Sequence, residues 1–298
     1  MSRSFLQSSQ WLHFLATEGQ QIHGQPPEWQ WVARSLGVFG TFWYGGLVRG
    51  GGEDVTRTIR EARASGAIFL RVSPADTETF DALVLSAPRI VRVSDAQPST
   101  SLVLDLRPDE ATLLSQFKTK TRYNIGVAQR HGVRVEVVRA PLDAETFAKV
   151  WELYADTAKR HGIRNHPRAH YEQAPGEWVL AWLGDELLNA HFCVGYDGVY
   201  TYLYGASSAA HKDVMASYLT QWVTIQHAKS AGYTHYDFWG IAPATADASH
   251  PYHGITRFKV GFGGDVVSYP GTFEIPVARG RYALYRVAKL VRSLLRGK

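Results

Sequence analysis

The most regular pattern of apolar and polar positions lies in the middle of the chain. Three strand-like apolar runs occupy residues 178–183, 187–196 and 199–204, and the pairs Gly184-Asp185 and Asp197-Gly198 separate them. Such pairs between apolar runs are typical of β-hairpins, because Gly and Asp suit the backbone conformations of tight turns. The segment therefore predicts an antiparallel meander of three strands.

Helical spacing precedes this meander. Asp143 stands where the N-cap of a helix is needed, and apolar residues then recur every three or four positions. This apolar stripe consists of Phe147, Val150, Trp151, Tyr154 and Ala158. The pattern predicts a helix that begins directly after Asp143.

The same order of elements occurs twice along the chain. In each half, aromatic strand-like runs are followed by a helical pattern that ends at a glycine, Gly66 in one half and Gly232 in the other. A further strand-like run comes after each glycine, which suits the left-handed conformation that ends many helices. The repetition predicts an α/β (α+β) chain of two similar units, residues 1–140 and 141–272, joined near Pro141.

Composition describes an ordinary soluble globular protein. Of the 298 residues, 45% are hydrophobic and 20% are charged. The formal charge of +5 suits an acidic partner such as RNA, a nucleotide phosphate or an anionic membrane. The single cysteine, Cys193, excludes an intrachain disulfide and a cysteine-based zinc site, and its apolar surroundings predict a buried thiol.

The two ends of the chain differ in character. The N-terminus lacks the apolar core of a signal peptide, and no segment approaches the roughly 20 apolar residues of a membrane span, so we expect a cytoplasmic protein. Residues 279–298 carry many arginines and lysines and no acid, with Leu284, Val287 and Val291 at helical spacing. This basic amphipathic helix either docks on the protein or touches an anionic membrane surface.

A cationic cluster lies on the helix predicted between Leu114 and Ala128. Its members are Lys118, Lys120 and Arg122. Like charges four positions apart destabilise an isolated helix slightly, so an anionic partner would give a reason for this cluster, while the more usual explanation of such clusters is a solvated cationic face.

Residues 160–168 form a second cationic segment, which ends a helix and is predicted to be a loop because of Pro167. The planar guanidinium of an arginine binds phosphate or carboxylate well, so Arg164 is a candidate ligand group, although a plain surface loop fits equally. The histidines His161 and His166 lack the spacing of zinc ligands, and no acid lies among them. No metal site is predicted.

Two further segments contain candidate site residues. Arg257 to Gly264 places Phe258 and Lys259 before three glycines, which suits either a hairpin end or a turn that holds a cation near a developing negative charge. Tyr200, Tyr202 and Tyr204 alternate along one strand and are expected on one face, as core or as a pocket rim.

Four blocks, taken in order, resemble the FemABX family of tRNA-dependent peptidoglycan aminoacyltransferases. The blocks are residues 122–125, 202–207, 236–241 and 254–264. The segment Phe5-Leu6-Gln7-Ser8 with Trp11 is also similar to the opening of that family. The resemblance implies two tandem GNAT-like (acyl-CoA N-acyltransferase-like) domains of the short type without a coiled-coil arm, with the C-terminal helix, residues 273–298, packed back on the first domain.

The resemblance also implies an aminoacyltransferase. Such an enzyme moves an amino acid from aminoacyl-tRNA to the stem-peptide amine of a peptidoglycan precursor, UDP-MurNAc-pentapeptide or lipid II, and so builds an interpeptide bridge. No cofactor is implied. We expect a monomer. Peripheral contact with the inner surface of the cytoplasmic membrane is compatible with this interpretation.

The family's motif places its catalytic lysine at Lys259, which would neutralise the oxyanion and the departing 3′ oxygen of the tRNA, beside Phe258. The substrate-binding residues that we expect are Arg164, His166, Tyr171, Tyr204, Tyr218, Arg257 and Asp105. The tRNA-binding residues that we expect are Lys118, Lys120 and Arg122. Asp105 either orients the attacking amine or makes a structural hydrogen bond.

Two other functions fit parts of the sequence. A GNAT-type N-acyltransferase would use acyl-CoA or another acceptor and would carry a Gln/Arg-x-x-Gly-x-Gly/Ala loop for the pyrophosphate, which the candidate segments do not match. A non-catalytic RNA or membrane-surface binder would explain the positive charge and would transfer no group.

Overall fold

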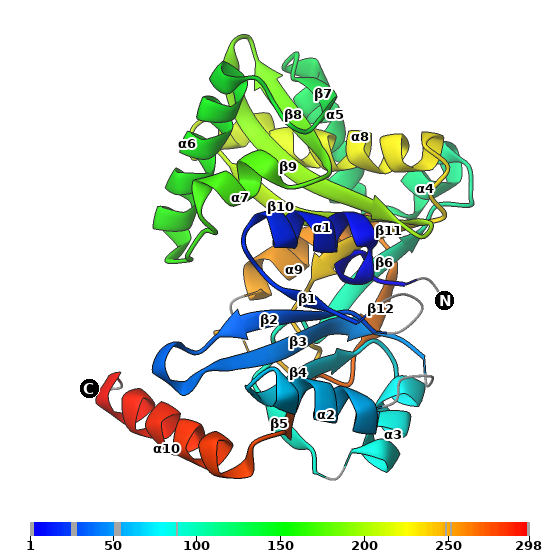
Figure 1. Cartoon of the computed structure of the whole chain (residues 1–298). Coiled ribbons are helices and arrows are strands. Elements are labelled where there is room, and N and C mark those ends of the chain that lie inside the picture. The colour runs from blue at the N-terminus through cyan, green and yellow to red at the C-terminus, as the bar shows by residue number, and fades with distance from the viewer. Residues whose placement is uncertain are drawn as a thin grey trace. The chain divides into compact units, whose positions relative to one another are not determined.

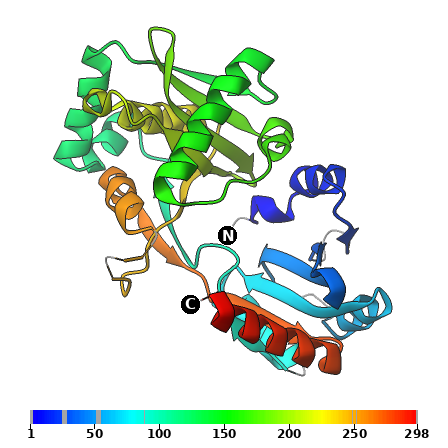
Figure 2. The same cartoon turned by 90° about the vertical axis from the view of Figure 1, so that its left-hand side faces the viewer.

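The computed structural model describes residues 3–24, 29–50, 55–87, 89–247, 249–250 and 252–296. These residues form two compact units, one within 3–99 and 269–296 and one within 100–268, and each is built around one sheet (Figures 1 and 2). The division thus falls between residues 99 and 100, whereas the sequence pattern placed it near Pro141. The reason is that residues 100–139 supply two strands of the second sheet.

The first unit holds a six-stranded sheet in the order β1-β2-β3-β4-β13-β5. Its elements are η1 (Phe5–Gln7), α1 (Ser9–Thr17), β1 (Ile22–His23), β2 (Trp31–Ser35), η2 (Gly37–Phe39), β3 (Thr41–Val48), α2 (Val55–Ala64), β4 (Ala67–Pro74), α3 (Thr77–Ser86), β5 (Val91–Val93), β13 (Thr272–Pro276) and α10 (Arg279–Arg296). Strands β3 and β4 are parallel, with α2 as the crossover between them. The helix-strand boundary that Gly66 predicts is confirmed, since Gly66 has a φ of +82° directly before β4.

Two separate core clusters stabilise this sheet. In one, Val55 and Ile59 of α2 pack with Leu83 of α3 and with apolar residues of β4. In the other, Tyr282 of α10 packs with Phe42 and Phe69, and Tyr285 lies against the same cluster. The C-terminal helix therefore belongs to the first unit, through its tyrosines rather than through its aliphatic residues.

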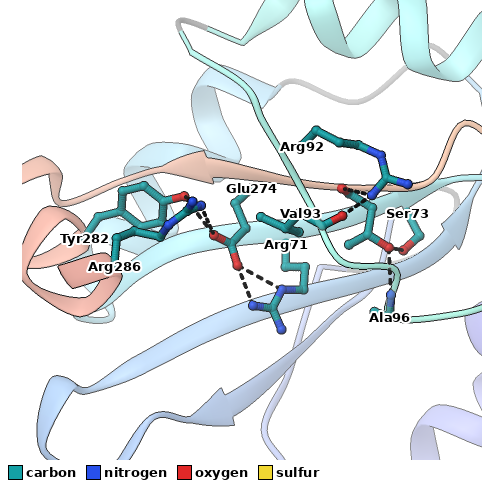
Figure 3. A network of polar contacts seen from close by, with 9 residues as sticks. Arg71, Ser73, Arg92, Val93, Ala96, Glu274, Tyr282 and Arg286 are labelled. Carbon is teal, nitrogen blue, oxygen red and sulfur yellow. Dashed lines mark hydrogen bonds and ion pairs between the residues drawn. The ribbon is translucent and has the colours of Figure 1, made fainter. Parts of the chain in front are cut away.

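A buried carboxylate fixes α10 to the sheet (Figure 3). Glu274 of β13 is 1% exposed and forms an ion pair with Arg71 of β4. Its other oxygen accepts a hydrogen bond of 2.8 Å from the Tyr282 hydroxyl, and the Arg286 guanidinium lies 3.7 Å from it. A buried carboxylate is stable only when cations and donors surround it, so this network determines which side of α10 faces the sheet.

The second unit holds a seven-stranded sheet in the order β12-β6-β11-β10-β9-β8-β7. Its elements are β6 (Thr100–Asp105), α4 (Glu110–Gln116), α5 (Thr119–Arg130), β7 (Arg134–Arg139), α6 (Ala144–His161), α7 (Arg168–Gln173), β8 (Glu177–Leu183), β9 (Glu186–Tyr196), β10 (Val199–Ser207), η3 (Lys212–Val214), α8 (Ala216–Ser230), β11 (His235–Gly240), α9 (His253–Lys259), η4 (Val260–Phe262) and β12 (Asp265–Ser268). The predicted meander is confirmed as β8, β9 and β10. Helix α6 begins after Asp143, whose carboxylate accepts hydrogen bonds from the amides of Glu145 and Thr146, as predicted.

The two units repeat one crossover. Strands β10 and β11 are parallel and are joined through α8, just as β3 and β4 are joined through α2. The prediction of two similar α/β units in tandem is therefore confirmed for the fold.

Two predicted elements differ from the structure. The single helix expected between Leu114 and Ala128 is broken at Phe117, which has an extended ψ of 144°, so α4 and α5 are separate helices. The segment from Arg257 is not a hairpin end but the last turn of α9, which continues into η4. Among the helices that the structure describes, none is long and apolar enough to cross a membrane.

Candidate functional site

A cavity of about 390 Å³ opens in the second unit, a volume typical of small-molecule sites. It lies where β10 and β11 separate, since these strands are paired only over Val199–Thr201 and His235–Asp237. The end of α6, the loop after it, α7 and α9 complete the walls. Its aromatic lining consists of Tyr154, Tyr171, Tyr202, Tyr204, Trp239 and Tyr252.

Lys259 is a buried cation in the wall of this cavity. Its side chain is 6% exposed, and its Nζ donates a hydrogen bond of 2.8 Å to the Gly240 carbonyl oxygen. The same Nζ lies 5.5 Å from the centre of the Tyr202 ring, a cation–π distance. Burial lowers the pKa of Lys259 to about 8, and attraction to Asp237 opposes this effect.

The end of β11 is shaped to present the Gly240 carbonyl to this lysine. Trp239 has a φ of +60°, which is rare for a bulky residue, and its amide donates a hydrogen bond of 2.7 Å to the Asp237 carboxylate. The Ser101 hydroxyl donates a second hydrogen bond to that carboxylate. Unusual backbone conformations of this kind persist where the surrounding structure enforces them, often at functional sites.

A β-bulge in β10 places two tyrosines at the cavity. The register against β9 shifts between Tyr202 and Tyr204, so Tyr202 lies opposite Cys193 while Tyr204 lies opposite Phe192. Because Cys193 and Phe192 point to opposite faces of β9, the prediction that Tyr200, Tyr202 and Tyr204 share one face is wrong. Gly205 is needed next to the bulge, because a Cβ there would lie 1.9 Å from the Tyr202 hydroxyl.

The cavity rim is the predicted loop between α6 and α7. It supplies Arg164 and His166, both exposed, and the His166 ring stacks on His170 at 4.2 Å between centres. The Nε2 of His170 lies 3.1 Å from the Tyr204 hydroxyl, and the His166 amide donates to the Tyr171 hydroxyl at 3.3 Å. These contacts join the loop to the aromatic wall and leave a cation at the mouth.

Five of the residues predicted for the site line this cavity. They are Lys259, Arg164, His166, Tyr171 and Tyr204. They come from four separate elements of one unit, which is how a ligand site is usually assembled.

Four other predicted residues do not line it. Phe258 packs against Tyr218 at 5.0 Å between ring centres, and both rings lie against the hydrophobic core of the second unit. Arg257 is exposed on α9. Asp105 is paired with His235, five residues along β11 from Gly240, and its carboxylate is bound bidentately by Arg107, which lowers its pKa to about 2. Asp105 therefore makes the structural contact that was one of its two predicted roles.

The predicted cationic cluster is divided by the break between α4 and α5. Arg122 donates hydrogen bonds to the carbonyl oxygens of Ser115 and Phe117 at the end of α4. Its guanidinium therefore stabilises the break between the two helices. Lys118 and Lys120 remain exposed at the start of α5. The Lys118 amide donates to the Gly261 carbonyl at 2.8 Å, which places this helix start beside the segment that follows Lys259.

Sequence reasoning gave no role to Asp237, Trp239, Tyr202 or His191. The first three lie inside the motif blocks 202–207 and 236–241. The motifs therefore include these residues but do not predict what their side chains contact. His191 is 1% exposed and its ring lies 4.2 Å from that of Tyr202. Burial, and then repulsion from Lys259, lower the pKa of His191 to about 3.

We expect His191 to make the second unit sensitive to acid. The unfolded chain takes up a proton on this histidine as the pH falls below 6.5, while the folded chain does not until about 3, so stability falls through that window. The loss amounts to as much as roughly 5 kcal/mol. Thermal melting at neutral and mildly acidic pH should show a smaller loss for His191→Phe than for the wild type. The matched control is His161→Phe at an exposed histidine, and equal acid sensitivity of the two variants would contradict the assignment.

Two other kinds of reactive group, metal ligands and the single thiol, differ from Lys259 in their placement. Among the residues that the structure describes, no group of three or more His, Cys, Asp or Glu side chains is placed to hold a metal ion. Burial raises the pKa of the Cys193 thiol well above its ordinary value, and the residue is fully buried. The cavity wall does hold a buried cation, Lys259.

Comparison with models of protein families identifies the family of this chain. The model of the FemAB family matches residues 87–176 and 184–290, more than half of the chain. The chain therefore belongs to the FemAB family.

Individual relatives match smaller parts. The chain is 30% identical over 111 residues to the aminoacyltransferase FemA of Staphylococcus epidermidis, which is 37% of this chain and 26% of that protein. It is 33% identical over 93 residues to FemA of Staphylococcus aureus, 31% of this chain and 22% of that protein. The matches thus span only about a quarter of the length of these relatives.

The fold extends over a larger share of the chain than the sequence similarity. A crystal structure of FemX superimposes with a TM-score of 0.78 over 95% of this chain and 94% of that one, at 16% identity. A tandem GNAT protein of the clavulanic acid pathway superimposes with a TM-score of 0.52 at 11% identity. The tandem GNAT-like fold is confirmed by these likenesses.

Proposed function

We propose that the protein is an aminoacyltransferase that moves an amino acid from aminoacyl-tRNA to the side-chain amine of a peptidoglycan precursor. The acceptor in this proposal is the stem peptide of UDP-MurNAc-pentapeptide or of lipid II. Membership of the FemAB family and the partial matches to proteins named aminoacyltransferase FemA support the class of reaction. The single observation that carries the proposal is the buried Lys259 in the cavity wall.

The reaction needs an amine to attack an ester. The nitrogen forms a bond to the ester carbonyl carbon, negative charge develops on the carbonyl oxygen, and the ribose 3′ oxygen leaves while the amine loses a proton and that oxygen gains one. The ester is already activated, so no enzymic nucleophile is needed. A desolvated ammonium at Lys259 would stabilise both oxygens, and such preorganised charge is commonly the largest catalytic contribution.

The other cavity residues suit the two substrates. Arg164 and His166 at the mouth are placed for an anionic group of the acceptor, for which a guanidinium is a strong ligand. Tyr171, Tyr204 and Trp239 offer aromatic surface to the peptide and sugar parts. The exposed Lys118 and Lys120 are assigned to the phosphates of the tRNA acceptor end, so binding of tRNA should weaken steeply with salt.

The test is a panel of charged tRNAs offered with UDP-MurNAc-pentapeptide or with lipid II, followed by mass spectrometry of the acceptor. We expect one amino acid to be added to one of the two acceptors. A parallel reaction with acetyl-CoA tests the GNAT-type alternative. Absence of any mass gain on both acceptors with every charged tRNA would refute the proposal.

A further inference from the structure

The C-terminal helix α10 turns an apolar side to solvent. Its exposed fractions are 62% for Leu284, 59% for Val287, 49% for Val291, 65% for Leu294 and 73% for Leu295. At 100° per residue these five side chains lie within about one third of the helix circumference, so they form one continuous stripe. Soluble proteins seldom leave such a stripe uncovered unless it binds something.

The exposure follows from how the helix is anchored. Tyr282 and Arg286 contact Glu274, and Tyr285 packs on Phe69, so the side of α10 that carries these residues faces the sheet (Figure 3). The aliphatic stripe lies on the other side of the same helix. A surface helix usually packs its apolar face on the core of the protein. Because α10 packs its tyrosine side there instead, its aliphatic face is available to another surface.

The charge of α10 decides between two occupants of this stripe. Between Arg279 and Arg296 the helix carries six arginines and lysines and no acid. A second copy of this chain would bring two such helices side by side, and their like charges would repel. An anionic surface offers the opposite charge, and the exposed Arg279 and Arg292 flank the stripe on its two sides, each about 110° from its centre.

We infer that α10 is a membrane-surface helix that binds anionic phospholipid. The helix lies in the plane of the interface, with Leu284, Val291 and Leu294 among the acyl chains and Arg279 and Arg292 at the level of the headgroups. This binding does not depend on aminoacyl transfer, since it concerns the first unit alone. It would bring the chain to the surface where lipid-linked substrates reside.

The experiment is sedimentation of the whole protein with vesicles of phosphatidylcholine alone and of an equimolar mixture of phosphatidylcholine and phosphatidylglycerol. We expect binding to the anionic vesicles, weakened by salt, and little binding to the neutral ones. Substituting Leu284→Ser, Leu294→Ser and Leu295→Ser together should lower binding by at least roughly a hundred-fold. Substituting Arg279→Gln and Arg292→Gln should lower it by roughly ten-fold or more and remove much of the preference for anionic lipid.

A control variant loses a comparable exposed apolar surface elsewhere. Val38 is 98% exposed and Leu85 is 88% exposed, so Val38→Ser with Leu85→Ser should bind vesicles like the wild type. The inference is overturned if neither vesicle binds the protein, or if the variants of α10 bind as well as the control. It is also overturned if ultracentrifugation without vesicles shows a dimer that the leucine variants abolish, because the stripe then belongs to a second copy.

Discussion

Lys259→Met is expected to lower aminoacyl transfer by roughly 10²–10³-fold, the usual effect of removing one donor that stabilises an oxyanion. The same substitution should not destabilise the fold. The pKa of Lys259 falls from 10.5 to about 8 on folding, so the unfolded chain holds this proton more tightly, and stability rises with pH between those values. At neutral pH the buried ammonium thus costs roughly 3 kcal/mol, which methionine does not.

The measurement pairs single-turnover transfer with thermal melting. A melting temperature equal to or above that of the wild type, together with a large loss of rate, separates a catalytic role for Lys259 from a structural one. Lys212→Met, at an exposed lysine of the same unit, is the matched control and should leave both quantities unchanged. Near-normal transfer by Lys259→Met would remove Lys259 from the mechanism.

Much of the fold can be predicted from the sequence because its signals are local. The hairpin pairs at 184–185 and 197–198, the Asp143 cap and the glycines that end two helices each report on a few neighbouring residues. The unit boundary is different, because it depends on which sheet β6 and β7 join. Pairing of β6 with β11 connects residues more than a hundred positions apart, and no local pattern records it.

The candidate site was predicted where a motif or a cluster of cations indicated it. Lys259 and Tyr204 lie in marked blocks and do line the cavity, and the loop with Arg164 was found from its cations. Phe258 lies in the same motif but packs on Tyr218 instead of lining the cavity, because successive side chains of helix α9 point 100° apart. The sequence recorded that Phe258 and Lys259 are adjacent, but it did not record that they point in different directions.

Asp237 and His191 were missed for a related reason. Asp237 interacts with Lys259 through space, and His191 approaches it through Tyr202 of the neighbouring strand. Such an environment arises from the register of β9, β10 and β11 together, and it determines how readily the lysine holds its proton. The residues that tune Lys259 are therefore visible only in three dimensions.

Asp237→Asn is expected to move the alkaline limb of the transfer rate to lower pH by roughly 1–2 units. The limb of the wild type should lie near 8, where Lys259 loses its proton. Asparagine still accepts hydrogen bonds from the Trp239 amide and the Ser101 hydroxyl, but it removes the negative charge that favours the protonated lysine. Transfer at about pH 8 should therefore fall roughly ten-fold, while transfer at mildly acidic pH stays close to that of the wild type.

Two further variants distinguish electrostatic tuning by Asp237 from support of the fold. Asp185→Asn, in the exposed turn between β8 and β9, removes the same charge and should leave the limb near 8. In a Lys259→Arg background the guanidinium stays charged at all accessible pH values, so Asp237→Asn should then cause no shift of the limb. If Asp237→Asn instead lowers the rate by one factor at every pH, the carboxylate only holds the end of β11 in place, and the protonation of Lys259 does not depend on it.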